Sequence, residues 1–355
     1  MYIKKIRLKN FRNYEDEFVE LKPGINVFYG DNAQGKTNIL ESIYLSSMGK
    51  SFRTKKDKEL IKIGKENSVI EVEYEKKDRD GKVKIEIEKK KNISLNGVKL
   101  KKLSEVLGNI HIVMFSPDDI NILKSGPAER RKFLDIMISQ LRPNYIYNLN
   151  LYLKTLEQRN YYLRQIKFEN KNKELLSIWN EKLAFHAEKI FKYRKEFIEK
   201  IKNHINVLHS KITNEKEILR IQYISDCEDK KEYIKKLIDT QAIDIQKGYT
   251  SKGIHRDDFI IYINERQVNV YGSQGQHRTV VLSLKLSELE IIYEEIGEYP
   301  VLLLDDFMSE LDKKRRNNFL KNIEGAQVLI TCTDKLQINE GQEFIVKKGK
   351  IEKEV

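Results

Sequence analysis

Residues Gly30 to Thr37 have the sequence GDNAQGKT, which matches the complete phosphate-binding pattern G-x-x-x-x-G-K-T. The mainly apolar stretch Ile25–Tyr29 before it predicts a strand, and residues 38–43 after it predict a helix. In such a loop the glycines let the backbone close around an anion, and N–H groups at the helix N-terminus face the phosphates. An ordinary strand-to-helix turn is the alternative, but the lysine at position 36 argues against it. The pattern therefore predicts a nucleoside triphosphate site.

The residues of this loop have distinct expected roles. Lys36 is expected to reach the β and γ oxygens of ATP and so to take part in catalysis, and Thr37 is expected to bind Mg²⁺. The whole loop is expected to bind the nucleotide, through Gly30, Asp31, Asn32, Ala33, Gln34, Gly35, Lys36 and Thr37.

The composition limits the class of protein. The chain has 355 residues, enough for one large core or two smaller ones, and its formal net charge is +12 with 34% charged residues. A positive field attracts polyanions such as nucleic acid, although Lys-rich and Glu-rich surfaces also arise from ion-pair networks in thermal adaptation. Charge alone thus favours a nucleic-acid partner without identifying one.

The cysteines and the hydropathy pattern indicate the compartment. Cys227 and Cys332 are far apart and form no C-x-x-C motif, so the sequence predicts neither a disulfide framework nor a zinc site. The first residues lack the apolar region of a signal peptide, and no run of about 18 apolar residues occurs. We therefore expect a cytoplasmic protein that neither is secreted nor spans a membrane.

Alternating apolar and charged residues predict an antiparallel sheet near the N-terminus. Residues Tyr2–Leu21 have the pattern of a hairpin. Two further alternating runs, Ser68–Glu75 and Lys82–Lys89, flank the turn-forming cluster Arg79-Asp80-Gly81. We expect these strands to form an antiparallel sheet beside the strand that precedes the phosphate-binding loop.

The middle of the chain is predicted to be helical. The long runs Tyr145–Phe168 and Glu174–Ile212 carry apolar residues at intervals of three or four, so two helices are expected to pack as an antiparallel arm. Trp179 and His186 lie on the apolar stripe and are expected to pack rather than to bind a ligand. Beyond the arm we expect a strand at Ile218–Ile224 and a helix at Lys230–Asp244.

A second element of a nucleotide site follows near residue 300. The apolar run Val301–Leu304 predicts a buried strand that ends in Asp305 and Asp306, as in a Walker B element. Asp305 is expected to bind the metal, and Asp306 is the expected catalytic residue that orients or deprotonates water. A core strand followed by a helix-capping aspartate is the alternative, which the phosphate-binding loop upstream makes the weaker interpretation.

A polar loop lies about 30 residues before Asp305. Ser273-Gln274-Gly275-Gln276 precedes a helix-like run, Arg278–Glu295. Such a loop is typical of the signature loop of ABC-type ATPases, which presents its serine and backbone N–H groups to the γ-phosphate in a partner subunit. Ser273, Gly275 and Gln276 are therefore expected to contact nucleotide, although an unspecialised polar turn is the alternative. Ser309-Glu310-Leu311-Asp312 matches the dimer-facing D-loop of that class.

Taken in order, these motifs resemble the RecF family, whose members are related to the ATPase heads of SMC-like proteins, over essentially the whole chain. Besides the elements above, the resemblance rests on Leu8–Tyr14, Gly24-Ile25-Asn26, Asn38–Ile43, Phe115–Asp119, Gly126–Asp135, His255–Asp258 and Asp305–Asp312.

The resemblance implies an α/β fold, a P-loop NTPase of the ABC-ATPase-head type with an inserted helical, short coiled-coil-like arm. The head would comprise residues 1–125 and 246–355, and the arm residues 126–245. It also implies a weak ATPase that uses ATP and Mg²⁺, forms an ATP-dependent homodimer, binds double-stranded DNA and gapped junctions, and assists RecA loading with RecO and RecR. Arg12 and Asn13 would contact the nucleotide.

The chain departs from ABC-type heads at two places. Asp306 stands where a glutamate is usual, which suggests slow turnover, and Thr331-Cys332-Thr333 stands where a histidine that senses the γ-phosphate is usual. We assign no Q-loop glutamine.

Three other classes of ATPase or GTPase share part of the pattern. An ABC transporter subunit would need a surface that couples to a membrane partner, and a long-armed chromosome-tethering ATPase would need far more helix than the roughly 85 residues between the motifs, at about 1.5 Å each. A small-molecule kinase or GTPase would explain the phosphate-binding loop but not the loop at Ser273.

Overall fold

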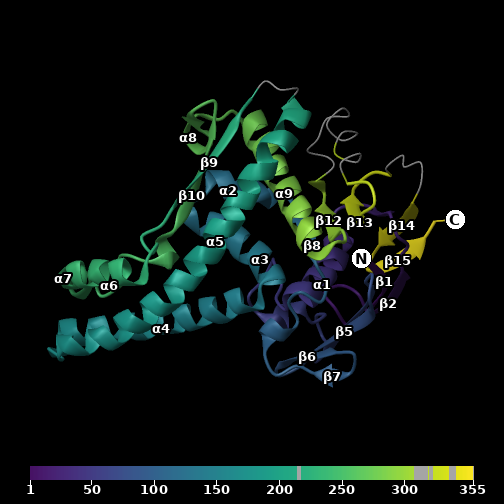
Figure 1. Cartoon of the computed structure of the whole chain (residues 1–355). Helices are drawn as coiled ribbons and strands as arrows, with labels where there is room; N and C mark the ends of the chain where they lie inside the picture. Colours follow the sequence, from purple (N-terminus) through teal and green to yellow (C-terminus); the bar gives the residue numbers. More distant parts are fainter. Residues whose placement is uncertain (214–216, 308–318, 320–322, 336–340, 355) are drawn as a thin grey trace. The chain divides into compact units, whose positions relative to one another are not determined.

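The computed structural model describes residues 1–213, 217–307, 319, 323–335 and 341–354 (Figure 1). The chain forms two compact units. We call Met1–Asp119 with Lys285–Val355 the P-loop unit, and Ile120–Leu284 the insert unit. Residues 246–284, which the sequence-based boundaries assign to the head, belong to the insert unit by this division.

A six-stranded sheet forms the centre of the P-loop unit. Its order is β15-β14-β3-β13-β12-β8, and every neighbouring pair is parallel except β14 with β15. The central strands are continuous apolar runs because a parallel sheet is covered on both faces. The strands are β3 (Ile25–Tyr29), β8 (Ile112–Phe115), β12 (Val301–Asp305), β13 (Val328–Cys332), β14 (Gln342–Lys347) and β15 (Lys350–Lys353).

The strand order determines where the two nucleotide motifs lie. The phosphate-binding loop follows β3, and Asp305 is the last residue of β12. Only β13 lies between these two parallel strands. Both motifs therefore leave the sheet at its carboxyl edge, which is where open α/β sheets bind ligands.

A second, antiparallel sheet in the same unit has the order β2-β1-β4-β5-β6-β7. The predicted N-terminal hairpin is confirmed as β1 paired with β2, and the predicted pairing of the next two runs is confirmed as β4 with β5. This sheet does not include β3. The strands are β1 (Tyr2–Lys9), β2 (Asp16–Glu20), β4 (Ser68–Glu75), β5 (Asp80–Ile87), β6 (Lys91–Leu95) and β7 (Val98–Lys99).

One predicted boundary in this sheet was wrong. Asp80 and Gly81 were assigned to the turn, but both lie in β5, where Gly81 pairs with Tyr74. A Cβ atom at Gly81 would lie 2.2 Å from the Tyr74 ring. The glycine therefore makes room for an aromatic ring on the neighbouring strand. In the sequence alone, such a glycine looks like a turn residue.

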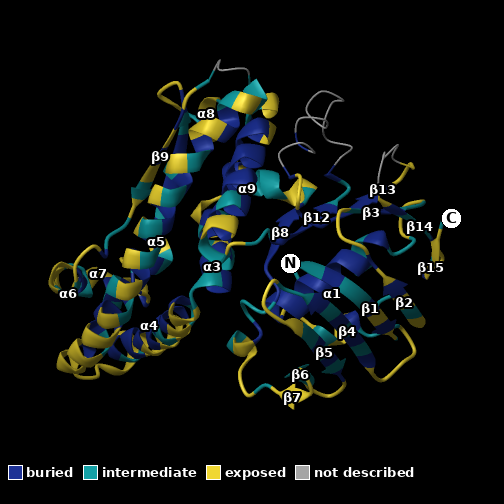
Figure 2. Ribbon diagram, turned by 45° about the vertical axis from the view of Figure 1, so that its right-hand side comes forward, coloured by how far each residue is buried: buried dark blue, intermediate teal, exposed yellow. Residues whose placement is uncertain are grey.

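Helix α1 (Lys36–Met48) contacts strands of both sheets. All of its residues from Ile39 to Met48 are buried, including three serines and Glu41, and Figure 2 shows most of the helix in the buried colour. A helix that is covered on every side has no polar face for solvent. The helix that begins at the phosphate-binding loop is thus held by the core of the unit.

The insert unit combines helices with a small sheet. Its sheet has the order β11-β10-β9 and is antiparallel. None of the helices in the described part of the chain is both long enough and apolar enough to cross a membrane. The elements are α2 (Asn121–Lys124), α3 (Pro127–Leu141), α4 (Pro143–Glu169), α5 (Leu176–Thr213), β9 (Leu219–Ile224), α6 (Lys230–Asp239), α7 (Gln241–Lys247), β10 (Asp258–Ile263), β11 (Arg266–Gln267) and α8 (Val268–Tyr271). Helix α9 (Gln274–Ile296) begins in this unit and ends in the P-loop unit.

Helices α4 and α5 form the predicted antiparallel pair. Arg194 Nε donates to the hydroxyl of Tyr145 at 2.9 Å, and Arg159 Nε donates to Asn180 Oδ1 at 2.9 Å. From Tyr145 to Arg159 the residue numbers on α4 rise, whereas those of the partners on α5 fall from Arg194 to Asn180, as an antiparallel pair requires. Pro143 separates α4 from α3, because proline ends one helix and is tolerated at the first position of the next.

Trp179 and His186 pack between the helices, as the sequence predicts. The Trp179 ring lies 4.6 Å from that of Tyr162, and His186 Nδ1 hydrogen-bonds Asn148 Oδ1 at 2.9 Å. Burial lowers the pKa of the His186 imidazole.

The single helix predicted at Lys230–Asp244 was wrong, because the chain forms α6 and α7 with Thr240 between them. Asp244 is fully buried on α7 and accepts a hydrogen bond from Arg159 Nη1 at 2.9 Å. The break turns Asp244 toward a buried cation, which sequence periodicity cannot reveal because the partner is 85 residues away.

A second buried cation, Arg194, joins three segments of the insert unit. Its guanidinium donates to Asp257 Oδ2 at 2.8 Å and to Asp135 Oδ1 at 2.9 Å, and its side chain is 1% exposed. We call Asp135, Arg194 and Asp257 the ionic cluster. A buried charge is tolerated when it is paired and hydrogen-bonded in this way.

Candidate nucleotide site

The phosphate-binding loop lies between β3 and α1, as predicted. Gly30 and Gly35 have φ values of 146° and 118°, which glycine adopts without strain. Asp31, Asn32 and Ala33 are exposed at the tip of the loop. The loop therefore presents its backbone to solvent at the N-terminus of α1, as an anion-binding loop requires.

Lys36 is folded against its own loop. Its Nζ donates to the carbonyl of Gly30 at 2.7 Å and to that of Asp31 at 2.9 Å, and only 4% of the residue is exposed. These two carbonyls hold the ammonium group within the curve of the loop. The cation is thus placed where an anion held by the loop would need a point charge.

Thr37 and Asp305 meet across the carboxyl edge of the sheet. Thr37 Oγ1 donates to Asp305 Oδ1 at 2.7 Å, and Thr331 Oγ1, at the end of β13, donates to the same oxygen at 2.8 Å. Burial raises the pKa of Asp305, and the two hydroxyl donors oppose that effect. A half-buried carboxylate whose hydrogen bonds come from neutral hydroxyls is an environment that a divalent cation stabilises.

The oxygen donors at this edge suit Mg²⁺. Magnesium is usually bound through one or two protein oxygens with substrate phosphates and water completing the shell. Among the described residues no group of three or more His, Cys, Asp and Glu side chains could hold a metal. Thr37 and Asp305 therefore fit a metal site that requires the nucleotide to be complete.

Asp306 follows β12 in a left-handed conformation, with φ of 47°. Its N–H donates to Thr331 Oγ1 at 3.0 Å. A non-glycine residue in this region is uncommon and directs its side chain differently from a continuing strand. The two adjacent aspartates thus have different surroundings, with Thr331 contacting both.

Asn13 supports the loop from β1 and its following turn. Asn13 Nδ2 donates to the carbonyl of Gln34 at 2.6 Å, and its Oδ1 accepts from Asn38 Nδ2 at 2.8 Å. Gln34 is also held by the turn between β14 and β15, where Lys348 N–H donates to Gln34 Oε1 at 2.6 Å and Gly349 N–H donates to Gln34 O at 3.2 Å. Two segments from opposite ends of the chain thus support the loop at Gln34.

Arg12 is held by an ion pair with helix α1. Its guanidinium donates to both carboxylate oxygens of Glu41, at 2.9 and 2.6 Å, and to the carbonyl of Glu59 at 2.8 Å. Glu41 is fully buried and also accepts from Ser51 Oγ at 2.5 Å. The structure thus gives Arg12 a positioning contact with α1 through Glu41, which the sequence analysis did not anticipate.

The loop at Ser273 begins helix α9 in the insert unit. The Gln276 N–H donates to Ser273 Oγ at 3.2 Å, and the Ser273 N–H donates to Gln276 Oε1 at 2.9 Å. This reciprocal pair is a capping box, in which each side chain satisfies the other's backbone. Ser273 and Gly275 are exposed, so the N-terminus of α9 is open to an anion from outside.

Comparison with known proteins then identifies the family. "DNA replication and repair protein RecF" of Clostridium botulinum (strain ATCC 19397 / Type A) is 44% identical over 365 residues, covering 99% of this chain and all of that relative. The protein of the same description from Clostridium novyi (strain NT) is 46% identical over 357 residues, covering 99% of this chain and 98% of the relative. The chain belongs to the RecF family. The family model described as "RecF/RecN/SMC N terminal domain" matches residues 2–352.

Solved structures agree with membership of the RecF family. "Structure of the recombination mediator protein RecF-ATP in RecFOR pathway" superposes with a TM-score of 0.95 at 42% identity, covering all of this chain and 98% of that one. An Smc head domain derived from Pyrococcus furiosus gives a TM-score of 0.58 at 16% identity, covering 99% and 95%. The fold class expected from the sequence, an ABC-type ATPase head with an insert, is confirmed.

Several RecF-like motif residues serve the structure rather than the nucleotide loop. Asp135 and Asp257 belong to the ionic cluster, and Arg130 donates to both oxygens of Asp258, at 2.6 and 3.0 Å. The motifs Gly126–Asp135 and His255–Asp258 therefore meet within the insert unit. The expected D-loop, Ser309-Glu310-Leu311-Asp312, lies outside the described residues.

Proposed function

We propose that this chain is an ATP-dependent DNA-binding protein of recombinational repair and replication restart. Membership of the RecF family supports a role in DNA repair. The hydrogen bond between Thr37 and Asp305 is the main support for ATP binding, because it joins the phosphate-binding loop to the strand that ends in aspartate. In this proposal ATP binding forms a homodimer, and slow hydrolysis releases it. The protein acts in the cytoplasm.

The loop and its neighbours bind ATP with Mg²⁺. Backbone N–H groups of residues 30–35 surround the phosphates, and Lys36 supplies a point charge at the β and γ oxygens. Thr37 and Asp305 would hold Mg²⁺, which neutralises charge on the phosphates. Asn13 supports the loop through Gln34, and Arg12 acts through Glu41 on the helix that begins at Lys36.

Asp306 is the proposed catalytic carboxylate. It would orient or deprotonate the attacking water, while Asp305 remains available to the metal. An aspartate is shorter than the glutamate usual in ABC-type heads, which supports slow turnover. The Asp306→Asn variant should bind ATP, lose most of its turnover and accumulate as the ATP-bound dimer. A wild-type hydrolysis rate in a phosphate-release assay would show that Asp306 is not the catalytic group.

The loop at Ser273 completes the active site of the partner subunit. Ser273 and Gly275 are exposed at the N-terminus of a 23-residue helix, which favours an anion such as the γ-phosphate. Gln276 holds the loop in shape through the capping box. This geometry supports ATP-dependent dimerisation over a kinase or GTPase, because those enzymes have no use for a second anion site of this type.

Light scattering with and without ATP tests the dimer. ATP should convert monomer to dimer, and Ser273→Arg should prevent it by placing a bulky cation at the helix N-terminus. Ser273→Thr is the matched control, since threonine also caps helices. A Ser273→Arg protein that dimerises as readily as wild type would remove the signature-loop assignment, and ATP binding without dimerisation would favour the kinase alternative.

The DNA partner is proposed from the family and the charge. Double-stranded DNA and gapped junctions are the proposed ligands, and RecO-type and RecR-type mediators the proposed protein partners in assisting RecA loading. Contacts should be made mainly to phosphates, since each neutralised phosphate contributes about 0.9 to the slope of log affinity against log salt. Fluorescence anisotropy across salt, with and without ATP, tests this. Flat salt dependence or equal affinity without ATP would contradict it.

A further inference from the structure

Thr331 lies near the end of β13 and is fully buried. Strands β12 and β13 are parallel, and their register places Thr331 beside Asp305. A threonine side chain has a stiff χ1 angle because its Cβ atom is branched. The hydroxyl of Thr331 is therefore fixed at the carboxyl edge of the sheet, where β12 ends at Asp305.

The Thr331 hydroxyl contacts the two adjacent aspartates in different ways. It donates its proton to Asp305 Oδ1 at 2.8 Å, and its oxygen accepts the Asp306 N–H at 3.0 Å. Its distance to the carbonyl of Leu304 is 3.4 Å, which is long for a hydrogen bond between oxygens. One side chain thus holds the carboxylate of one aspartate and the backbone of the next.

The hydrogen bonds of Asp305 distinguish its two carboxylate oxygens. Oδ1 accepts from both hydroxyls, that of Thr331 at 2.8 Å and that of Thr37 at 2.7 Å. Oδ2 accepts no hydrogen bond from any residue that the structure describes, and it is not one of the fully buried unpartnered side-chain atoms in that part of the chain. Oδ2 is thus the oxygen that remains accessible to a cation.

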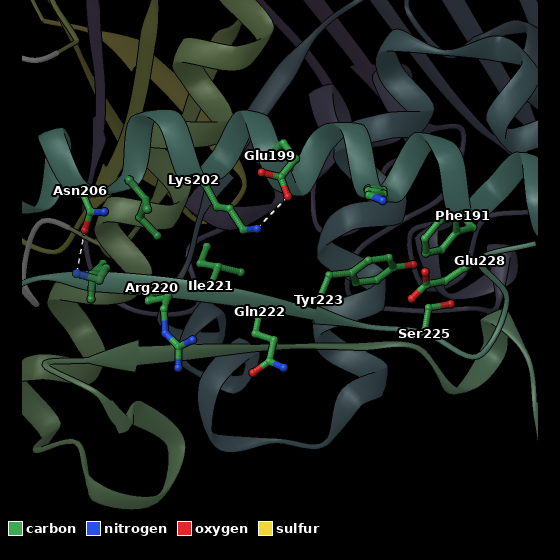
Figure 3. A pocket seen from close by; sticks show the side chains of 13 residues that line it. Phe191, Glu199, Lys202, Asn206, Arg220, Ile221, Gln222, Tyr223, Ser225 and Glu228 are labelled. Carbon is green, nitrogen blue, oxygen red and sulfur yellow. Dashed lines mark hydrogen bonds and ion pairs between the residues drawn. The ribbon is translucent and has the colours of Figure 1, made fainter.

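The slot between α5 and β9 in the insert unit offers a contrast. Its volume is about 510 Å³, and charged side chains line it, as Figure 3 shows. Most of these charges are satisfied within the chain, because Lys202 pairs with Glu199 at 2.7 Å and Arg220 pairs with Glu265 at 3.4 Å. A charge that is already paired gains little from a ligand, whereas Oδ2 of Asp305 has no partner among the described residues.

Asp306 leaves the direction of the strand immediately after this point, with φ of 47°. A residue other than glycine keeps such a left-handed conformation only when its surroundings support it. The hydrogen bond from the Asp306 N–H to the buried Thr331 hydroxyl is one such support. Thr331 thus helps to set the direction in which the Asp306 side chain leaves the backbone.

We propose that Thr331 is a positioning residue for ATP hydrolysis, which fixes the oxygen of Asp305 that faces Mg²⁺ and holds the backbone from which Asp306 acts on water. This role rests on the proposed function, in which Asp305 holds the metal and Asp306 is the catalytic carboxylate. Thr37 also donates to Oδ1, but its own oxygen is a proposed ligand of Mg²⁺. Thr331 is not a proposed ligand, so it holds Oδ1 with or without the metal.

Thr331→Val removes the hydroxyl at nearly constant volume, and calorimetric titration of ATP with and without Mg²⁺ tests its role in the full-length chain. In EDTA the variant should bind ATP within about twofold of wild type, because the phosphate-binding loop is unchanged. With Mg²⁺ its ATP affinity should fall by about tenfold, because Asp305 is free to turn Oδ2 away from the metal. In a phosphate-release assay its kcat should fall by about 10-fold to 100-fold.

Two further variants separate the hydroxyl from a general disturbance. Thr331→Ser keeps the hydroxyl and should recover most of the Mg²⁺-dependent affinity and of the turnover. Thr155→Val is the matched control, because Thr155 is a buried threonine of α4 whose hydroxyl donates to the carbonyl of Leu151 in its own helix. This control should bind and hydrolyse ATP as the wild type does.

The outcomes distinguish the role of Thr331 from the metal site itself. If Thr331→Val binds ATP with Mg²⁺ and turns it over as the wild type does, the positioning role is overturned. Equal losses of ATP affinity with and without Mg²⁺, or losses that Thr331→Ser does not recover, would overturn it as well. A wild-type protein whose ATP affinity does not depend on Mg²⁺ would overturn the proposed metal site, and the role of Thr331 with it.

Discussion

The phosphate-binding loop and the ionic cluster both contain charged residues in family motifs, but they satisfy their charges in different ways. In the loop, Lys36 donates hydrogen bonds to two backbone carbonyls of its own turn, and the tip residues are exposed. In the cluster, Arg194 is buried and meets two carboxylates of the chain. A charged residue that is fully paired inside the protein stabilises the fold. A charged residue that is held beside an exposed backbone loop is available to a ligand.

Breaking the ionic cluster should have the largest effect on stability. Arg194→Met leaves Asp135 and Asp257 without their buried cation, and removing one partner of such a pair costs about 3–5 kcal/mol of the free energy of unfolding. Lys192→Met is the control, because its side chain is 68% exposed and the change should stay within about 0.5 kcal/mol. Urea unfolding measures both. Equal midpoints for the two variants would refute a stabilising role for the cluster.

The corresponding change in the loop should affect binding more than folding. Lys36→Met removes the point charge proposed for the phosphates, so ATP affinity in a calorimetric titration should fall on the order of a hundredfold. Two carbonyls also lose a donor, which should lower stability by about 1–3 kcal/mol. Lys22→Met, an exposed change in the same unit, should leave both quantities near wild type. Unchanged ATP affinity in Lys36→Met would contradict the assigned site.

Acid should weaken the insert unit through a half-buried histidine, His255. His255 Nε2 donates to the carbonyl of Thr250 at 3.0 Å, its Nδ1 accepts from the Tyr152 hydroxyl at 2.8 Å, and burial lowers its pKa to about 4. The unfolded state, with a pKa near 6.5, binds the proton more readily. This contribution is therefore complete above about pH 6.5 and is lost as the pH falls toward 4, by about 2 kcal/mol between pH 7 and pH 5.

A glutamine at this position isolates the effect of the histidine. His255→Gln keeps a donor and an acceptor but does not titrate. The difference in unfolding free energy between the wild type and this variant should fall as the pH is lowered from 7 to 5. A difference that is constant with pH would show that His255 does not titrate differently on folding.

The smallest expected effect concerns the turn that supports the loop. Gly349 has φ of 71°, and a Cβ there would lie 2.6 Å from the carbonyl oxygen of Asn13. Gly349→Ala should displace Asn13, loosen Gln34 and lower ATP affinity by about tenfold. Gly64→Ala is a matched control, because Gly64 has φ of 83° and open space around its Cβ position. Equal affinities in the two variants would show that only backbone strain matters.

The sequence predicts the local elements of this comparison but not the contacts between them. Ile25–Tyr29 is a strand as predicted, because a short apolar run between turn residues indicates a strand without information from distant residues. The roles of Thr331 and Gln34 were missed, because each depends on segments that are distant in the chain and adjacent only in the sheet. The cation facing Asp244 was missed for the same reason. The partner of Gly81, Tyr74, is close in the chain, and it was missed because the glycine was assigned to the turn.

The position of β3 has a consequence for the order in which the protein can be made. Its neighbours in the sheet are β13 and β14, which begin at residues 328 and 342, whereas β3 ends at residue 29. At translation rates of about 5–20 residues per second, the loop strand waits roughly 15–60 s for its first neighbour. A ribosome-bound chain that lacks these strands would expose an apolar strand and hold no nucleotide. Synthesis of the chain through β13 and β14 is thus itself a condition for ATP binding.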